Sequence, residues 1–81
     1  MRVEIYSLQR ILFEGDAASV NCKTAMGEIT VLESHEPLIS MLEEGPVKVV
    51  PAGGGPEQAF AVKGGFLQVN PEHAVRMLVE E

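Results

Sequence analysis

The stretch Gly27–Leu42, GEITVLESHEPLISML, decides the fold of this chain. Apolar and polar residues alternate over residues 28–31, which predicts a half-buried strand. Pro37 then removes a backbone donor and disfavours helical geometry in the residue before it. A corner is therefore expected at Pro37, followed by a short strand at Leu38–Leu42.

Three strands are expected before this stretch, because residues 2–6 and 18–23 alternate and residues 11–14 form a short apolar run. Gly15-Asp16 is read as a turn between the second and third strands. The third strand is expected to pair with residues 28–31 as a hairpin.

The second half of the chain repeats this pattern. Gly53-Gly54-Gly55-Pro56 is expected to close a hairpin and Gly64-Gly65 to interrupt a strand. The strands predicted here cover residues 47–50, 60–63, 66–69 and 75–79. No helical periodicity is sustained, so the fold class is all-β, a flattened antiparallel β-sandwich or barrel, in one domain over residues 1–81.

The composition excludes several classes of partner. The formal net charge is −6 and the six Lys and Arg residues are scattered, so nucleic acid and anionic lipid are not expected as partners. The single Cys22 can form no internal disulfide and has no companion for a zinc site, which favours a reducing compartment. The sequence shows neither a signal peptide nor an apolar run long enough to span a bilayer, so we expect no direct lipid insertion.

No catalytic, cofactor or metal site is predicted. Ser34 and His35 are adjacent, and on an extended chain their side chains point to opposite faces, which argues against a nucleophilic triad with Asp16. The three glycines at 53–55 lack the Lys-Ser/Thr and the helix of a phosphate loop and favour a hairpin tip. Cys22 fits a buried core position better than a reactive one.

The sequence also has more apolar residues than one buried sheet face needs. Leu8, Leu12, Met41, Val50 and Leu78 fall on or beside the outward faces of their predicted strands. They indicate either a two-sided sandwich core or an exposed docking patch. If there is a patch, we expect it at Met41 and Leu42.

Three motifs in register resemble the N-terminal domain of the epsilon subunit of F-type ATP synthases, which is called delta in mitochondria. The opening strand with Ser7, Phe13 and Gly15 is similar to the start of that family. The other two motifs are Gly27-Glu28 followed by His35-x-Pro37-Leu38, and Gly64-Gly65-x-x-x-Val69. Glu33-Ser34 and Glu36 depart from the family's Pro-Gly and Ala around the histidine.

The resemblance implies a sandwich of about ten strands at the foot of the rotor, in a non-catalytic subunit without a cofactor. Such a subunit docks the gamma subunit to the c-ring and couples proton translocation to ATP synthesis. Carried over by position, Glu28 and His35 would face the c-ring, and Ser7, His35, Ser40 and Met41 would lie near gamma.

The chain ends where family members commonly continue into a pair of helices, which suggests coupling without inhibition of ATP hydrolysis. In a bacterium the protein would lie at the cytoplasmic face of the inner membrane as a peripheral subunit of the complex.

Two other functions fit an acidic all-β module of this size. A lipoyl- or biotinyl-type carrier domain needs a modifiable lysine at a hairpin tip, and Lys23 is the one candidate, although its flanks lack the usual motif. A peptide-binding β-sandwich that recognises its ligand by strand addition is the other alternative.

Overall fold

The computed structural model describes residues 1–33, 36–72 and 74–81, and in them it contains eight β-strands and no helix. The strands are β1 Arg2–Tyr6, β2 Ile11–Thr24, β3 Gly27–Leu32, β4 Leu38–Leu42, β5 Gly45–Pro51, β6 Gln58–Val62, β7 Gly64–Val69 and β8 Ala74–Glu80. The all-β prediction is confirmed. The count is eight in place of about ten, in part because two predicted strands are one.

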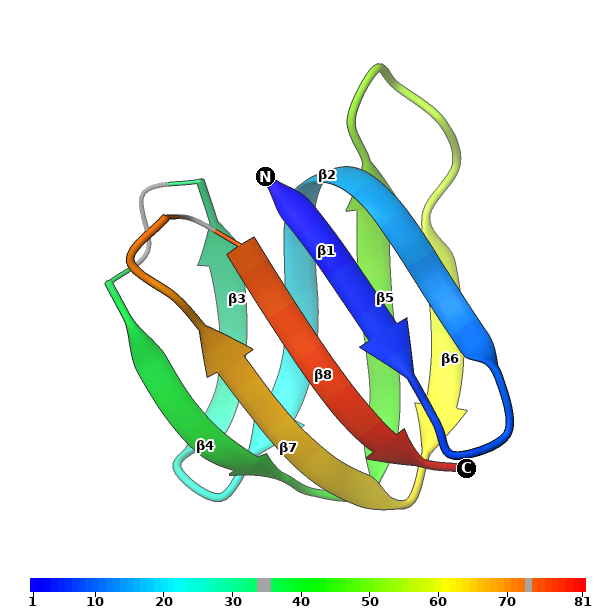
Figure 1. Ribbon diagram of the computed structural model, residues 1–81, viewed down its shortest axis with the longest axis vertical. Coiled ribbons are helices and arrows are strands. Elements are labelled where there is room, and N and C mark those ends of the chain that lie inside the picture. The colour runs from blue at the N-terminus through cyan, green and yellow to red at the C-terminus, as the bar shows by residue number, and fades with distance from the viewer. Residues whose placement is uncertain (34–35, 73) are drawn as a thin grey trace.

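The strands lie in two layers (Figure 1). One layer carries β4, β7, β8 and β1 side by side, and the other carries β3, β5 and β6. Most neighbours are antiparallel, and β1 and β8 are parallel. The strand β2 belongs to both layers, since it pairs with β1 at its start and with β3 and β5 further on.

The predicted turn at Gly15-Asp16 is wrong. Both residues lie inside β2, where Gly15 pairs with Val3 and Asp16 with Arg2. Gly15 is nearly extended, at φ 158°. Pairing with β1 therefore outweighs the local turn preference of the Gly-Asp pair, and the strand passes without interruption from one layer into the other.

Alternation along each strand builds the core between the layers. In β8 every second residue from Val75 to Val79 is buried, and β1 buries Val3 and Ile5 in the same way. The buried hydrophobic residues are Val3, Ile5, Ala17, Val20, Cys22, Val31, Leu42, Val47, Val49, Val62, Leu67, Val69, Val75, Met77 and Val79. Most of them are β-branched, which suits a pleated surface packed on one side.

Hydrogen bonding closes most of the strands into a ring. The order β1-β8-β7-β4-β2 returns to β1, while β5 and β6 extend from β2 and β3 pairs with it. The expected hairpin between β2 and β3 is confirmed, and so is the hairpin tip at Gly53-Gly54, where φ is 87° and 89°. Gly64-Gly65 does not interrupt a strand but begins β7.

Candidate docking surface

A row of exposed apolar side chains crosses the outer face of the layer that contains β4, β7, β8 and β1. Strand register places one residue of each strand, and the first residue of β2, side by side: Met41, Phe66, Leu78, Tyr6 and Ile11. The exposed fractions of Met41, Phe66 and Leu78 are 59%, 57% and 47%. We call these five residues the apolar row. A contiguous apolar strip of this kind on an ordered sheet is typical of a protein–protein interface.

The neighbouring row on the same face is mostly polar. It runs through Ile39, Gln68, Arg76, Glu4 and Glu14. The Tyr6 hydroxyl donates to Glu4 Oε1 at 2.9 Å, and Arg76 Nε donates to the same oxygen at 3.1 Å. These contacts, first the hydrogen bond from Tyr6, hold the pKa of the Glu4 carboxyl below its usual value. The polar row therefore fixes the orientation of Tyr6 at the border of the apolar row.

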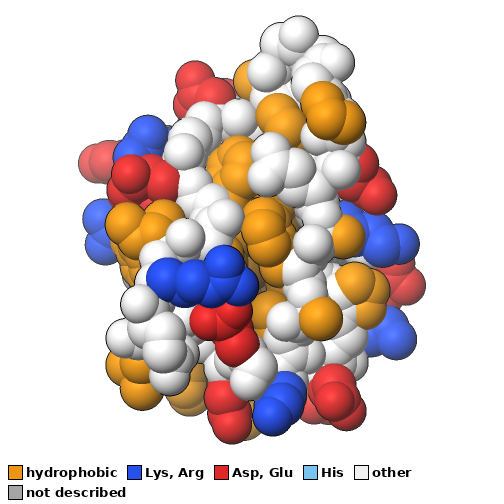
Figure 2. Space-filling view, turned by 90° about the vertical axis from the view of Figure 1, so that its right-hand side faces the viewer, with side chains coloured by type: hydrophobic (Ala, Val, Ile, Leu, Met, Phe, Trp, Pro, Cys, Tyr) orange, Lys and Arg blue, Asp and Glu red, His pale blue; other side chains and the backbone are white. Residues whose placement is uncertain are grey.

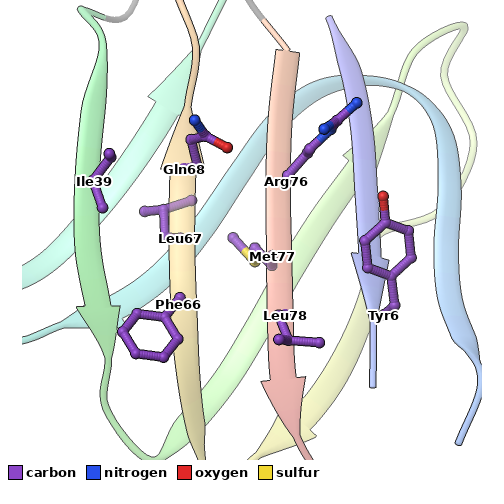
Figure 3. Close-up of a pocket in the computed structure, with 8 residues that line it drawn as sticks. All are labelled: Tyr6, Ile39, Phe66, Leu67, Gln68, Arg76, Met77 and Leu78. Atoms are coloured by element: carbon purple, nitrogen blue, oxygen red, sulfur yellow. The ribbon is translucent and has the colours of Figure 1, made fainter. Parts of the chain in front are cut away.

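An open groove of about 440 Å³ lies across both rows (Figure 3). Its floor is formed by Leu67 and Met77, which point into the core and are fully buried. Phe66 and Leu78 stand at its side, from adjacent strands. Because the floor is packed core, the shape of this surface exists before any partner binds.

A second apolar groove, of about 390 Å³, continues the surface towards the turn between β1 and β2. Leu8, at the tip of this turn, is 91% exposed. Ser7 holds the turn closed, because its Oγ accepts hydrogen bonds from the backbone N–H groups of Gln9 and Arg10 at 3.1 and 3.2 Å. It also donates to Glu81 Oε2 at 2.7 Å, and Arg10 Nη2 forms an ion pair with the other oxygen of Glu81 at 2.6 Å.

The residues expected near gamma fall on different sides of the structure. Met41 is exposed on the outer face and belongs to the apolar row, whereas its neighbour Ser40 is buried on the inner face of β4. Ser7 is buried and its hydroxyl is occupied in the turn. Leu42, which we expected in the patch, is 3% exposed and belongs to the core, because it follows Met41 in the alternation of β4.

The residues expected near the c-ring are Glu28 and His35. Glu28 is exposed on β3, in the other layer, where its Oε2 accepts a hydrogen bond from Asn21 Nδ2 at 3.1 Å. His35 lies outside the described residues. The structure therefore does not place Glu28 on the apolar row.

The sequence prediction missed Phe66 and Ile39, although both are prominent on this surface. Phe66 precedes Leu67, so the sequence offers two adjacent apolar residues of which only one can face the core. Register with Met41 decides between them, and it is seen only in the paired sheet.

Two further candidates from the sequence, Cys22 and Lys23, lie in the described part of the chain. Cys22 is buried as expected, and burial raises the pKa of its thiol to about 11. Lys23 lies within β2 and not at a hairpin tip, with its aliphatic stem against Gly45, which disfavours the carrier-domain alternative. In the described part of the chain, no three His, Cys, Asp or Glu side chains are grouped as metal ligands would be. The same residues include no helix that could cross a bilayer.

Comparison with known proteins gives one consistent family. The model of the ATP synthase delta/epsilon chain beta-sandwich domain matches residues 1–81. The chain is 42% identical over 80 residues to an ATP synthase epsilon chain of Mycolicibacterium vanbaalenii, covering 99% of this chain and 65% of that protein. It is 41% identical over 71 residues to that of Bordetella petrii, covering 88% of this chain and 50% of that protein.

Solved structures agree with this result. A chain in the cryo-EM structure of Euglena gracilis mitochondrial ATP synthase superposes with a TM-score of 0.88 at 25% identity, covering 98% of this chain and 49% of that chain. A chain in the Tetrahymena thermophila mitochondrial ATP synthase central stalk and c-ring structure gives 0.84 at 17% identity, covering 100% and 63%. The present chain thus spans about half to two thirds of the proteins it matches.

Proposed function

Because this chain belongs to the family of the ATP synthase delta/epsilon beta-sandwich domain, we propose that it is a non-catalytic subunit of the central stalk. In this role it docks the gamma subunit to the c-ring and couples proton translocation to ATP synthesis. In a bacterium it would lie at the cytoplasmic face of the inner membrane, held there by its partners.

The observation that carries the proposal is the apolar row. A coupling subunit must transmit torque without deforming, and its interface must therefore be ordered before it binds. The row lies on paired strands over a close-packed core, so docking costs little conformational entropy. It contains two aromatic residues, Phe66 and Tyr6, and aromatic side chains are enriched at protein–protein interfaces. We therefore assign the row, with Met41 at its end, to the gamma side.

The c-ring side is assigned to Glu28 together with His35. Glu28 lies on the other layer from the apolar row, so the two partners would be bound by different surfaces of one rigid body. Its carboxylate is exposed and held by Asn21, which suits contact with basic or polar groups of a loop. The proposal also places Ser7 and Ser40 near gamma. Both are buried, so they would contribute indirectly, by stabilising the backbone around them.

The decisive experiment is co-elution of the purified chain with purified gamma subunit, with Met41→Asp as the test variant. A charge within the apolar row should weaken binding at least about tenfold, as loss of an interface anchor does. Leu32→Asp is the matched control, since Leu32 is 55% exposed on β3 in the other layer. Both variants should keep the fold, because both positions are exposed.

Loss of binding in Met41→Asp alone would support the proposal. No binding of the unmodified chain at any salt concentration would overturn it, and equal loss in both variants would overturn the assignment of the interface.

We also propose that this sandwich couples without inhibiting ATP hydrolysis. The purified chain would be added to a catalytic head complex from which the epsilon subunit has been removed. Hydrolysis should stay within about twofold of its starting rate. A change of that size corresponds to less than about 1 kcal/mol in the activation barrier. Strong suppression would contradict this part of the proposal and leave the docking role standing.

A further inference from the structure

The strand β6 presents a free backbone edge in the layer opposite the one that carries the apolar row. Among the described residues, β6 pairs only with β5, over Gln58–Val62. Exposed edges of natural sheets are normally protected by charged residues, Pro or a bulge within the strand, or by the shortness of the strand, because an open edge accepts another strand. The sequence of β6, QAFAV, contains no charged residue and no proline. No charged residue or proline within this short strand therefore blocks strand addition.

The edge is symmetric about its central residue. Ala59-Phe60-Ala61 reads the same in both directions, and the two alanines are exposed while Phe60 is partly buried against the core. The residues that flank the strand are opposite in charge, Glu57 before it and Lys63 after it. Both are exposed, and no hydrogen bond or ion pair of their side chains occurs within the described chain.

We propose that two copies of this chain associate through β6, with the two strands antiparallel and Phe60 opposite Phe60. In this register Ala59 of each copy faces Ala61 of the other. Glu57 of each copy lies opposite Lys63 of the other, so that two ion pairs close the ends of the joined strands. The two-fold axis passes through Phe60, and the layers that contain β3, β5 and β6 become one continuous sheet.

Side-chain size supports this occupant. Ala59 and Ala61 put only methyl groups on the exposed face of the strand, so pairing at this edge would bury no polar side chain at these two positions. The two Phe60 rings come together as a cross-strand aromatic pair. Figure 2 shows the side of the molecule on which β6 lies, where hydrophobic side chains gather in a vertical band. Pairing through β6 would cover part of that band.

Charge makes the association weak and specific. Each copy carries a net charge of −6, which opposes the approach of two copies. The contact is short, at five residues of each strand. The complementary charges of Glu57 and Lys63 then favour this edge and this register over other ways of pairing. The association uses neither Met41 nor Phe66, and it does not depend on the proposed docking of gamma.

A charge-exchange cycle, followed by sedimentation equilibrium over a range of concentrations, tests the proposal. Glu57→Lys places two lysines opposite each other at both ends of the pairing, and Lys63→Glu places two glutamates there. Each single change should weaken dimerisation about tenfold, because two ion pairs become two repulsive contacts. The double variant Glu57→Lys/Lys63→Glu restores both pairs and should recover dimerisation.

Recovery in the double variant supports the β6 pairing, because a change that merely damages the fold would not be rescued by a second change. A chain that stays monomeric up to about 1 mM would overturn the proposal, since even a weak complex would be populated at that concentration. A dimer whose affinity does not respond to the cycle would also overturn it, because such a dimer would use another surface.

The register is tested separately by disulfide formation. Ala59→Cys and Ala61→Cys chains, mixed, would carry cysteines on directly opposed residues, whose Cα atoms lie about 5 Å apart in an antiparallel pair. Each variant alone would have its cysteines two residues out of register. The mixture should therefore cross-link much faster than either variant alone. Equal rates in all three samples would contradict the register that we propose.

Discussion

At Gly65 the backbones of β7 and β8 approach each other too closely for any side chain. A Cβ atom at this position would overlap the carbonyl oxygen of Leu78 and would lie 2.8 Å from Val79 Cα. The residue also has φ +141°, in the region that favours glycine. Both obstacles are backbone, so neither can be relieved by rotation of a side chain. Glycine at this position is a requirement of the strand pairing that supports the apolar row.

We predict that Gly65→Ala lowers the free energy of unfolding by about 3 kcal/mol or more, because β7 and β8 must separate to admit the methyl group. Urea denaturation measures the change. Gly54→Ala is the matched control, since Gly54 also has positive φ, at +89°, but a methyl group on it would meet no other atom within 4 Å. It should cost about 1 kcal/mol, the conformational penalty alone. Equal costs for the two variants would show that the close approach at Gly65 does not matter.

At the scale of an element, neighbouring residues of β7 serve different purposes: one stabilises the fold and the next belongs to the proposed docking surface. Leu67 is fully buried and forms the floor of the groove, while Phe66 stands beside it on the outer face. Consecutive residues of a strand point to opposite faces, so the two side chains serve the two sides of the same sheet. Truncating each of them should therefore affect different properties.

Leu67→Ala is expected to lower the free energy of unfolding by about 3 kcal/mol, because it leaves a cavity in the core. Phe66→Ala should lower it by less than about 1 kcal/mol, the size of a cross-strand contact, and should weaken binding of gamma. Thermal unfolding and co-elution, measured on both variants, check the separation. A large loss of stability in Phe66→Ala would mean that the apolar row is part of the core and is not a free docking surface.

At the scale of the whole molecule, the chain carries the two proposed binding surfaces on one body, whose first and last strands are joined by sheet pairing. The parallel pair of β1 and β8 brings the first and last strands together, and β2 connects the two layers. The loop between β5 and β6, residues 52–57, projects beyond the layers and is exposed (Figure 1). Changes of length should be tolerated in this loop and nowhere within the ring of strands.

Six Gly and Ser residues inserted between Gly53 and Gly54 would double the length of this loop. The expected cost is about 0.6 kcal/mol from loop closure, which corresponds to a fall in melting temperature of about 3 °C for a chain of this size. The same insertion between Arg76 and Met77 would break the register of β8 with both β1 and β7 and should abolish cooperative unfolding. Calorimetry of the two variants distinguishes them, and comparable melting temperatures would contradict this view of the fold.

The sequence by itself determined the fold class, most strands and their hairpins, and the family, because alternation and turn residues are local signals. It also placed Met41 and Leu78 on outward faces. It could not show that β2 runs through Gly15-Asp16, since the pairing with β1 that straightens this segment comes from another part of the chain.

Only the tertiary structure decided which apolar residues form the proposed docking surface. Phe66 and Leu67, or Met41 and Leu42, are equally apolar neighbours in the sequence, and strand register assigns one of each pair to the core. The alignment of Met41, Phe66, Leu78, Tyr6 and Ile11 across five strands likewise exists only in the assembled sheet. The physical reason is that alternation fixes the two faces of each strand, whereas pairing between distant strands fixes which residues become neighbours.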